Sequence, residues 1–200
     1  MADLEHIYAD GRKKLEKRLT PFRLLHSIST SDIAGLMANV YGVNNEYAVL
    51  AGLLHDWDKN YTDAQLMKRA EVFNIDLTDD PRHLASLLHA QTGACALAKE
   101  YKDLPAEIIQ AIARHTSAAT DMSELDMIIY IADMIEPLRS ASNLQHLRTL
   151  AGNIPLEELF IKCYRDTLEH LIRRQRYIHP GSVEVWNAYA ARKHGKTGKG

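Results

Sequence analysis

The sequence predicts an all-α protein built as a single helical bundle. Apolar residues recur at i, i+3 and i+4 through most of the chain, which is the spacing of one helix face. No segment alternates apolar and polar residues with strong β-formers, so no substantial sheet is expected. A chain of 200 residues with 46% hydrophobic residues is long enough to bury one core without disulfides.

The breaks between the expected helices fall where Gly, Pro, Asn and Asp gather. The first helix mixes charged and apolar residues, the second carries an apolar stripe, and the third is apolar almost all round. The expected helices cover residues 3–19, 22–41, 46–57, 63–73, 82–101, 105–115, 123–136, 155–178 and 183–193.

The clearest helix is the segment 155–178. Pro155 suits the first helical turn, and basic residues cluster at the far end, where the helix dipole favours cations. Its apolar face either completes the core of one chain or serves a homodimer, and the sequence leaves both open. That face consists of Leu156, Leu159, Phe160, Cys163, Thr167, Leu168, Leu171 and Ile172.

The chain is expected to form one domain over residues 1–180, followed by a packing helix at 181–194 and a flexible tail at 195–200. Charged residues interrupt the first 25 positions, so no signal peptide is indicated. The longest apolar stretch, at 48–54, is about a third of the ~20 residues that a membrane span requires. We therefore expect a cytoplasmic protein that does not associate with membranes.

Composition excludes some classes of function. Lys and Arg number 24 against 26 Asp and Glu, a formal charge of −2, which excludes a broad cationic surface for duplex nucleic acid. Two cysteines are too few for a disulfide scaffold. Ten histidines direct attention to metal binding, because histidine is the commonest metal ligand.

The segment 48–59 carries the first chemical signal. An apolar helix ends in His55 and Asp56, and Lys59 follows three residues later. An imidazole and a carboxylate at the edge of a core are costly unless their polarity is compensated. A divalent cation provides that compensation, because these two ligand types suit Fe, Mn, Co or Zn. A solvent-exposed helix end is the alternative.

Four further polar residues interrupt apolar helices in the same way. They are His26, His89, His115 and Asp133. Any one of them alone is more often a satisfied core residue, but a buried aspartate without a partner would be expensive. Together they favour a shared metal site.

In the order His26, His55-Asp56 and Asp133, the chain resembles the HD superfamily of metal-dependent phosphohydrolases, an all-α fold. Motifs between about residues 20 and 140 narrow this to the YqeK subgroup, bacterial enzymes that split diadenosine tetraphosphate symmetrically into two ADP. The motifs are Arg23-x-x-His26-Ser27, Leu50-Ala51-Gly52-Leu53-Leu54-His55-Asp56-x-x-Lys59, Leu88-His89-Ala90, Ala113-Arg114-His115-Thr116 and Tyr130-Ile131-Ala132-Asp133-Met134-Ile135-Glu136-Pro137-x-Arg139.

The resemblance implies an HD-type helical bundle whose metal ligands are His26, His55, Asp56 and Asp133. It also implies a divalent transition metal, with iron first and Mn or Co as alternatives, bound as one or two ions. Metal-activated water would attack phosphorus, with Asp56, Lys59, His89 and His115 catalytic. The residues expected to contact the dinucleoside polyphosphate substrate are Lys59, His89, His115, Thr116, Tyr130 and Arg139.

One position departs from the subgroup, and two other functions remain open. Trp57-Asp58 replaces the more usual aliphatic and small pair, so Asp58 is expected to point outward or to pair with a cation such as Arg23. One alternative function is an HD-type nucleotidase or phosphodiesterase that acts on mononucleotides, cyclic dinucleotides or guanosine polyphosphates. The other is a non-catalytic HD signalling module, although such modules typically lack metal ligands that this chain retains.

Overall fold

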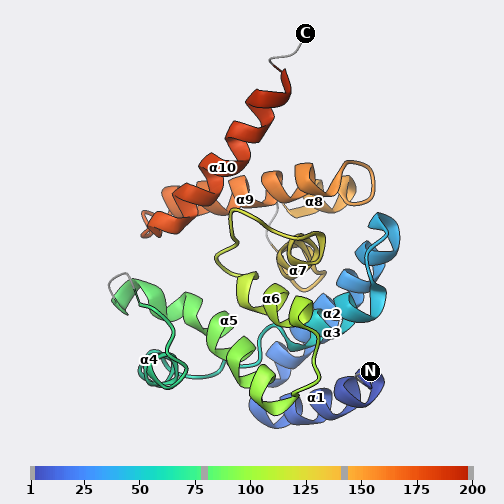
Figure 1. Cartoon of the computed structure of the whole chain (residues 1–200). Coiled ribbons are helices and arrows are strands. Elements are labelled where there is room, and N and C mark those ends of the chain that lie inside the picture. The colour runs from blue at the N-terminus through green and yellow to red at the C-terminus, as the bar shows by residue number, and fades with distance from the viewer. Residues whose placement is uncertain (1–2, 78–80, 141–143, 198–200) are drawn as a thin grey trace.

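The structure, a computed structural model, describes residues 3–77, 81–140 and 144–197, with side chains except those of 81–86 and 193–197. All regular structure in these ranges is helical, which confirms the all-α class (Figure 1). The helices are α1 (Leu4–Arg18), α2 (Pro21–Tyr41), α3 (Asn45–Leu54), α4 (Asp63–Val72), α5 (Pro81–Glu100), α6 (Ala106–Arg114), α7 (Glu124–Ile135), α8 (Leu144–Leu150), α9 (Leu156–Arg173) and α10 (Pro180–Thr197).

Side-chain caps explain where several helices begin. Thr20, Asn44, Thr62 and Ser123 each accept a hydrogen bond from the backbone N–H three residues further on. Such a cap satisfies a donor that has no partner within the helix. At the other end of α2, Gly42 adopts a left-handed conformation with φ of 75°, which ends the helix.

Helix α7 lies at the centre of the molecule. It is seen end-on in the middle of Figure 1, and it packs against α2, α3, α6, α8 and α9. It is buried on almost every side. A polar side chain on α7, such as that of Asp133, is therefore held in a rigid frame.

The apolar face of the 155–178 segment is used within the chain. Helix α9 packs against α7, α8 and α10 and buries Leu159, Phe160 and Cys163. Tyr189 of α10 meets Phe160 edge-on, with ring centroids 5.1 Å apart. The first part of this face therefore completes the core of one chain, whereas Ile172 near the end of α9 is exposed.

Two helix ends were predicted too far along the chain. Helix α3 ends at Leu54 instead of 57. Helix α9 ends at Arg173 instead of 178, and Gln175 beyond it takes a positive φ of 51°. In both cases apolar residues beyond the helix made the periodic pattern look longer than the helix.

Helix α8 was not predicted. It has seven residues, of which Leu144 and Leu147 are buried, and two apolar residues are too few to define a period. Helix α10 is longer than expected and extends to Thr197, through the first three residues of the segment expected to be a tail. Residues 198–200 lie outside the described residues.

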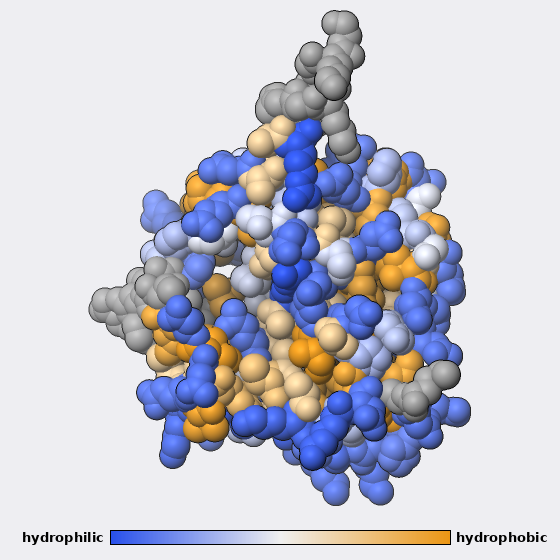
Figure 2. All heavy atoms as spheres, viewed as in Figure 1, coloured by the Kyte–Doolittle hydropathy of each residue, from blue (hydrophilic) through white to orange (hydrophobic). Residues whose placement is uncertain are grey.

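Within the described part of the chain, no helix combines the length and apolar character needed to cross a membrane. Figure 2 shows a largely hydrophilic rim, with more hydrophobic residues gathered over α5 and α6.

Candidate active site

Six side chains from five helices converge on one point beside α7. All but Asp133 are buried, and the side chain of Asp133 is 21% exposed. They are His26 of α2, His55 and Asp56 at the end of α3, His89 of α5, His115 at the end of α6, and Asp133 of α7. These residues were singled out by the sequence, and the fold brings all of them together.

A glycine allows α2 and α3 to approach closely. A Cβ atom on Gly52 would lie 2.8 Å from Cα and 3.1 Å from N of Ser31, both backbone atoms of α2. Real Cβ atoms do not come this near to backbone, so the approach requires glycine at this position. As a result, Nε2 of His55 lies 3.2 Å from Nε2 of His26.

The chain turns sharply after α3, and this turn places three functional residues. His55 is the C-cap of α3. The backbone N–H of Trp57 donates to Leu54 and that of Lys59 donates to Asp56, at 3.1 and 3.0 Å. The turn directs His55 and Asp56 inward and returns Lys59 to the same side.

Hydrogen bonds at Nδ1 orient three of the histidine rings. Nδ1 of His55 donates to the carbonyl of Gly52 and Nδ1 of His115 to that of Ile112, each at 2.7 Å. Nδ1 of His26 donates to Oε1 of Glu136 at 3.0 Å. Carbonyl and carboxylate oxygens accept hydrogen bonds and do not donate them. Each of these imidazoles, when neutral, therefore has its proton on Nδ1 and a lone pair on Nε2.

The Nε2 atoms face one another in pairs, which is the feature that fits a metal ion. The two pairs are His26 with His55 at 3.2 Å and His89 with His115 at 3.3 Å. Two lone pairs at this distance repel each other unless a proton or a cation lies between them. Ligands bonded to one ion at about 2.1 Å lie roughly 3 Å apart, so the spacing suits a shared cation.

The two aspartates complete the donor set. Oδ1 of Asp133 lies 2.9 Å from Nε2 of His26 and 3.7 Å from Nε2 of His55. Oδ1 of Asp56 lies 3.2 Å from Nε2 of His89 and 3.7 Å from Nε2 of His115. Three ligand groups arise, each with atoms within 4.8 Å of one another: His26, His55 and Asp56; His55, His115 and Asp133; Asp56, His89 and His115.

Protonation states in the cluster also suit metal binding. Burial lowers the pKa of His55 to about 4 and also lowers the pKa of His89. Burial alone would raise the pKa of Asp56, but its imidazole neighbours hold it well below its usual range. Burial lowers the pKa of His26 as well, but its bonds to Asp133 and Glu136 outweigh this and raise it.

Among the side chains that the structure describes, three cations surround the cluster. Lys59 donates from Nζ to Nε2 of His89 at 3.0 Å, and burial lowers the pKa of this lysine. Arg139 donates from Nη2 to Oδ1 of Asp133 at 2.6 Å. Nη1 of Arg23 lies 3.4 Å from Oδ2 of Asp56. A local cationic site therefore exists on a chain whose net charge is −2.

A cavity of 480 Å³ opens beside the cluster, and Thr116 and Tyr130 line it together with His115, Asp133 and Arg139. Thr116 donates from Oγ1 to the carbonyl of Leu87 at 3.3 Å. The hydroxyl of Tyr130 pairs with Oγ1 of Thr167 at 3.0 Å. Tyr130 is buried and its hydroxyl has a protein partner, so the ring serves the core as well as the cavity wall.

Asp58 does not pair with Arg23 and does not point outward. Its side chain is fully buried, and it bonds Nη2 of Arg18 at 3.0 Å and Nε of Arg69 at 2.8 Å. The expectation of a cationic partner is met by two arginines from α1 and α4. Packing between helices that are far apart in the sequence brings Arg18 and Arg69 to Asp58, and no local spacing identifies these two arginines.

Glu136 and Arg148 are parts of the site that the sequence did not single out. Glu136 is 1% exposed and bonds His26, although its only sequence signal is its place in the Asp133–Arg139 motif. Arg148 of α8 donates to the carbonyls of Ile135, Glu136 and Arg139. No motif marks Arg148.

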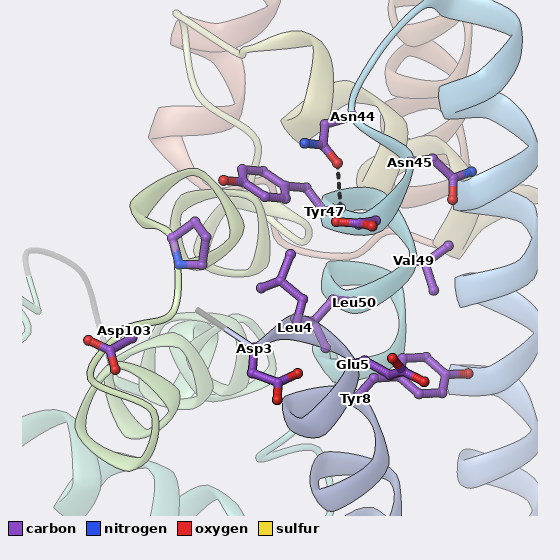
Figure 3. Close-up of a pocket in the computed structure, with 12 residues that line it drawn as sticks. Asp3, Leu4, Glu5, Tyr8, Asn44, Asn45, Tyr47, Val49, Leu50 and Asp103 are labelled. Atoms are coloured by element: carbon purple, nitrogen blue, oxygen red, sulfur yellow. Dashed lines mark hydrogen bonds between the residues drawn. The ribbon is translucent and has the colours of Figure 1, made fainter. Parts of the chain in front are cut away.

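A larger cavity lies elsewhere and does not fit an anionic ligand. It measures 860 Å³ and lies between α1, the start of α3 and the segment before α6 (Figure 3). Among the described residues that line it, the charged ones are all acidic: Asp3, Glu5, Glu46 and Asp103. The smaller cavity beside the histidines therefore carries the candidate chemistry.

Known proteins are similar to this chain in both sequence and fold. A model of the HD domain matches residues 23–138. The protein named symmetrical bis(5'-nucleosyl)-tetraphosphatase in Halalkalibacterium halodurans is 30% identical over 173 residues, covering 86% of this chain and 91% of the relative. Its counterpart of the same name in Bacillus subtilis is 28% identical over 176 residues, covering 86% and 92%.

A solved structure agrees with these relatives in fold. A crystal structure from Clostridium acetobutylicum, described as a predicted HD superfamily hydrolase involved in NAD metabolism, matches with a TM-score of 0.87 and 29% identity. The match covers 92% of this chain and 97% of that one.

Proposed function

Because the chain belongs to the HD-domain family of hydrolases, we propose that it cleaves diadenosine tetraphosphate and related dinucleoside polyphosphates symmetrically. Water forms a bond to one inner phosphorus, the central P–O–P bond breaks, and two ADP result. The observation that supports this most is the facing pairs of Nε2 atoms, 3.2 and 3.3 Å apart, at one end of a cavity.

His26, His55, Asp56 and Asp133 would hold a divalent transition metal, with iron first and Mn or Co as alternatives. The ion supplies Lewis acidity and lowers the pKa of water. Three of these ligands are held in deprotonated form, since burial keeps His55 neutral and the cluster keeps both carboxylates ionised. The pKa of His26 is raised, so an ion bound there would displace a proton.

The role of His89 depends on the number of ions. Its Nε2 either accepts from Lys59 at 3.0 Å, as here, or joins Asp56 and His115 in holding a second ion. One lone pair cannot do both. In a one-ion enzyme, Lys59 and His89 form a proton-holding pair beside the leaving ADP. In a two-ion enzyme, Lys59 is released to bind phosphate.

Arg139, Thr116 and the cavity they line provide the binding region for one half of the substrate. Arg139 is partly exposed and carries the positive charge that a polyphosphate requires. Tyr130 contributes a wall to the cavity, its hydroxyl being engaged by Thr167.

The experiment is a panel of nucleotides incubated with purified protein and Mn²⁺ or Fe²⁺, with products separated by chromatography. We expect diadenosine tetraphosphate to give ADP alone. Survival of this substrate while a mononucleotide, a cyclic dinucleotide or a guanosine polyphosphate is cleaved would replace the proposed substrate. Inactivity on the whole panel by metal-loaded protein would favour a signalling module.

The proposed location of the protein is the cytoplasm. Its proposed ligands are dinucleoside polyphosphates, and duplex nucleic acid is not a proposed partner. The first turns of α9 pack against their own chain and Ile172 near its end is exposed, so a homodimer stays a proposal. Sedimentation velocity measures the oligomeric state directly.

A further inference from the structure

We propose that Glu136 is a positioning residue that fixes the tautomer of the metal ligand His26 and couples it to the turn that carries Arg139. The inference rests on the metal site of the proposed function and is independent of the substrate. It concerns a side chain that belongs to none of the three ligand groups found among the described residues.

The two carboxylate oxygens of Glu136 have separate donors. Oε1 accepts from Nδ1 of His26 at 3.0 Å, and Oε2 accepts from the backbone N–H of Leu138 at 2.7 Å. The residue is 1% exposed, so water does not compete for either bond. A group with two acceptors and no donor is required here, and the ionised carboxylate supplies it.

The bond to His26 leaves its Nε2 with the lone pair that points at His55 and Asp133. For His55 and His115 the same task falls to backbone carbonyls within their own turns. His26 lies inside α2, where the nearby carbonyls are used by the helix, and it relies on a side chain from another helix. This makes Glu136 the one replaceable partner among these three orienting bonds.

The bond to Leu138 shapes the turn after α7. Glu136 is the C-cap of that helix, with ψ of 150°, and Arg148 holds its carbonyl at 2.8 Å. The turn brings Arg139 back so that its Nη2 lies 2.6 Å from Asp133 and its Nε 4.0 Å from Glu136. One carboxylate thus connects a metal ligand to the arginine beside the cavity.

Glu136→Gln separates this role from simple packing. The glutamine has nearly the same shape but one acceptor oxygen, so either Leu138 or His26 meets an amide NH₂ group. When the NH₂ group faces His26, the ring must accept at Nδ1 and carry its proton on Nε2, which blocks the metal. We expect the affinity for Mn²⁺, measured by electron paramagnetic resonance of the free ion, to fall roughly 10- to 100-fold.

A matched control lies on the same helix. Asp126 in the first turn of α7 is also a buried carboxylate, and it accepts from the backbone N–H of Ser123 and from Arg114. Asp126→Asn is expected to lower the melting temperature while leaving Mn²⁺ affinity within about twofold of the wild type. Equal loss of Mn²⁺ affinity in the two variants would mean that buried carboxylates act only through stability.

Imidazole nitrogen NMR of the metal-free protein at alkaline pH gives a second readout. The wild type should show His26 protonated at Nδ1, and Glu136→Gln should show protonation shifted toward Nε2. If the variant does not fold, the wild-type spectrum still decides, because protonation of His26 at Nε2 would overturn the proposal. A wild type that binds no Mn²⁺ contradicts the metal site itself. A wild type and a Glu136→Gln variant that bind Mn²⁺ equally overturn only the role of Glu136.

Discussion

At the scale of residues, the ability of the proposed metal site to bind a cation depends on which nitrogen of each histidine carries the proton. His55 and His115 take their orientation from carbonyls three residues earlier in the chain, so α3 and α6 aim these rings as they form. Burial then lowers the pKa of His55, which keeps the ring neutral and able to bind a cation. In the metal-free protein, the same burial lowers the folding stability at acidic pH.

Substituting His55 should flatten the pH dependence of stability in the metal-free protein. The pKa of His55 is lowered from 6.5 to about 4 on folding, so the unfolded chain takes up the proton first. The contribution of the neutral ring is complete above pH 6.5, declines as the pH falls, and is lost below about 4. Its steepest slope is about 1.4 kcal/mol per pH unit.

Urea unfolding of the wild type and of His55→Gln across this pH window measures the difference in slope. Parallel curves for the two proteins would show that His55 is not buried in neutral form.

Asp58 acts on stability through two arginines. Asp58→Asn leaves Arg18 and Arg69 without their shared carboxylate in a site where the aspartate is fully buried. We expect a loss of about 2–3 kcal/mol, reduced from the value for a buried pair because both arginines are partly exposed. Asp121→Asn, at a residue whose side chain is 74% exposed, is the control and should cost less than about 0.5 kcal/mol. Equal unfolding midpoints for the two variants would refute this role.

At the scale of elements, the approach of α2 to α3 sets the distance between the first two ligands. Gly52 permits that approach, and α7 supplies Asp133 from the opposite side. Helix ends place two more rings: His55 and His115 are C-caps, so a shift of either helix end would move a ring of the cluster.

Gly52→Ala should weaken both folding and metal binding. The new methyl group meets the backbone of Ser31 at 2.8 Å, and backbone cannot rotate away as a side chain does. A loss of about 1–3 kcal/mol in unfolding free energy is expected. Because α3 must move away from α2, the affinity for Mn²⁺ should fall as well.

Gly42→Ala provides the comparison for this prediction. Its Cβ would meet nothing within 4 Å, but φ of +75° strains the alanine by about 1 kcal/mol. It should lower stability and keep the Mn²⁺ affinity. Unchanged metal affinity in Gly52→Ala would show that the close approach does not set the ligand spacing.

At the scale of the whole molecule, the sequence predicted features that depend on local residue patterns and did not predict features that depend on contacts between distant segments. Polar residues in apolar helices identified all six members of the cluster, because an uncompensated polar group in a core is expensive wherever it occurs. Long-range pairing was not accessible: nothing near Asp58 points to Arg18 or Arg69, and nothing near His26 points to Glu136. Helix α8 was missed because two buried leucines define no period.

Metal removal should lower the stability of the entire fold. The four expected ligands come from α2, the end of α3 and α7, so an ion that binds only the folded state stabilises these helices together. At a free metal concentration 100 times the Kd, the stabilisation is about 2.7 kcal/mol. This corresponds to a melting temperature roughly 5–10 °C higher than with chelator. Asp56→Ala should show little change between the two conditions, and an equal shift would place the ion elsewhere.

The facing histidines and aspartates are expected to form a metal centre. The most direct test is the ratio of transition metal to protein in the purified protein, measured by mass spectrometry of the elements for the wild type and Asp56→Ala. We expect at least one equivalent in the wild type and nearly none in the variant. A wild type without metal, or an Asp56→Ala protein with the same metal content, would contradict it.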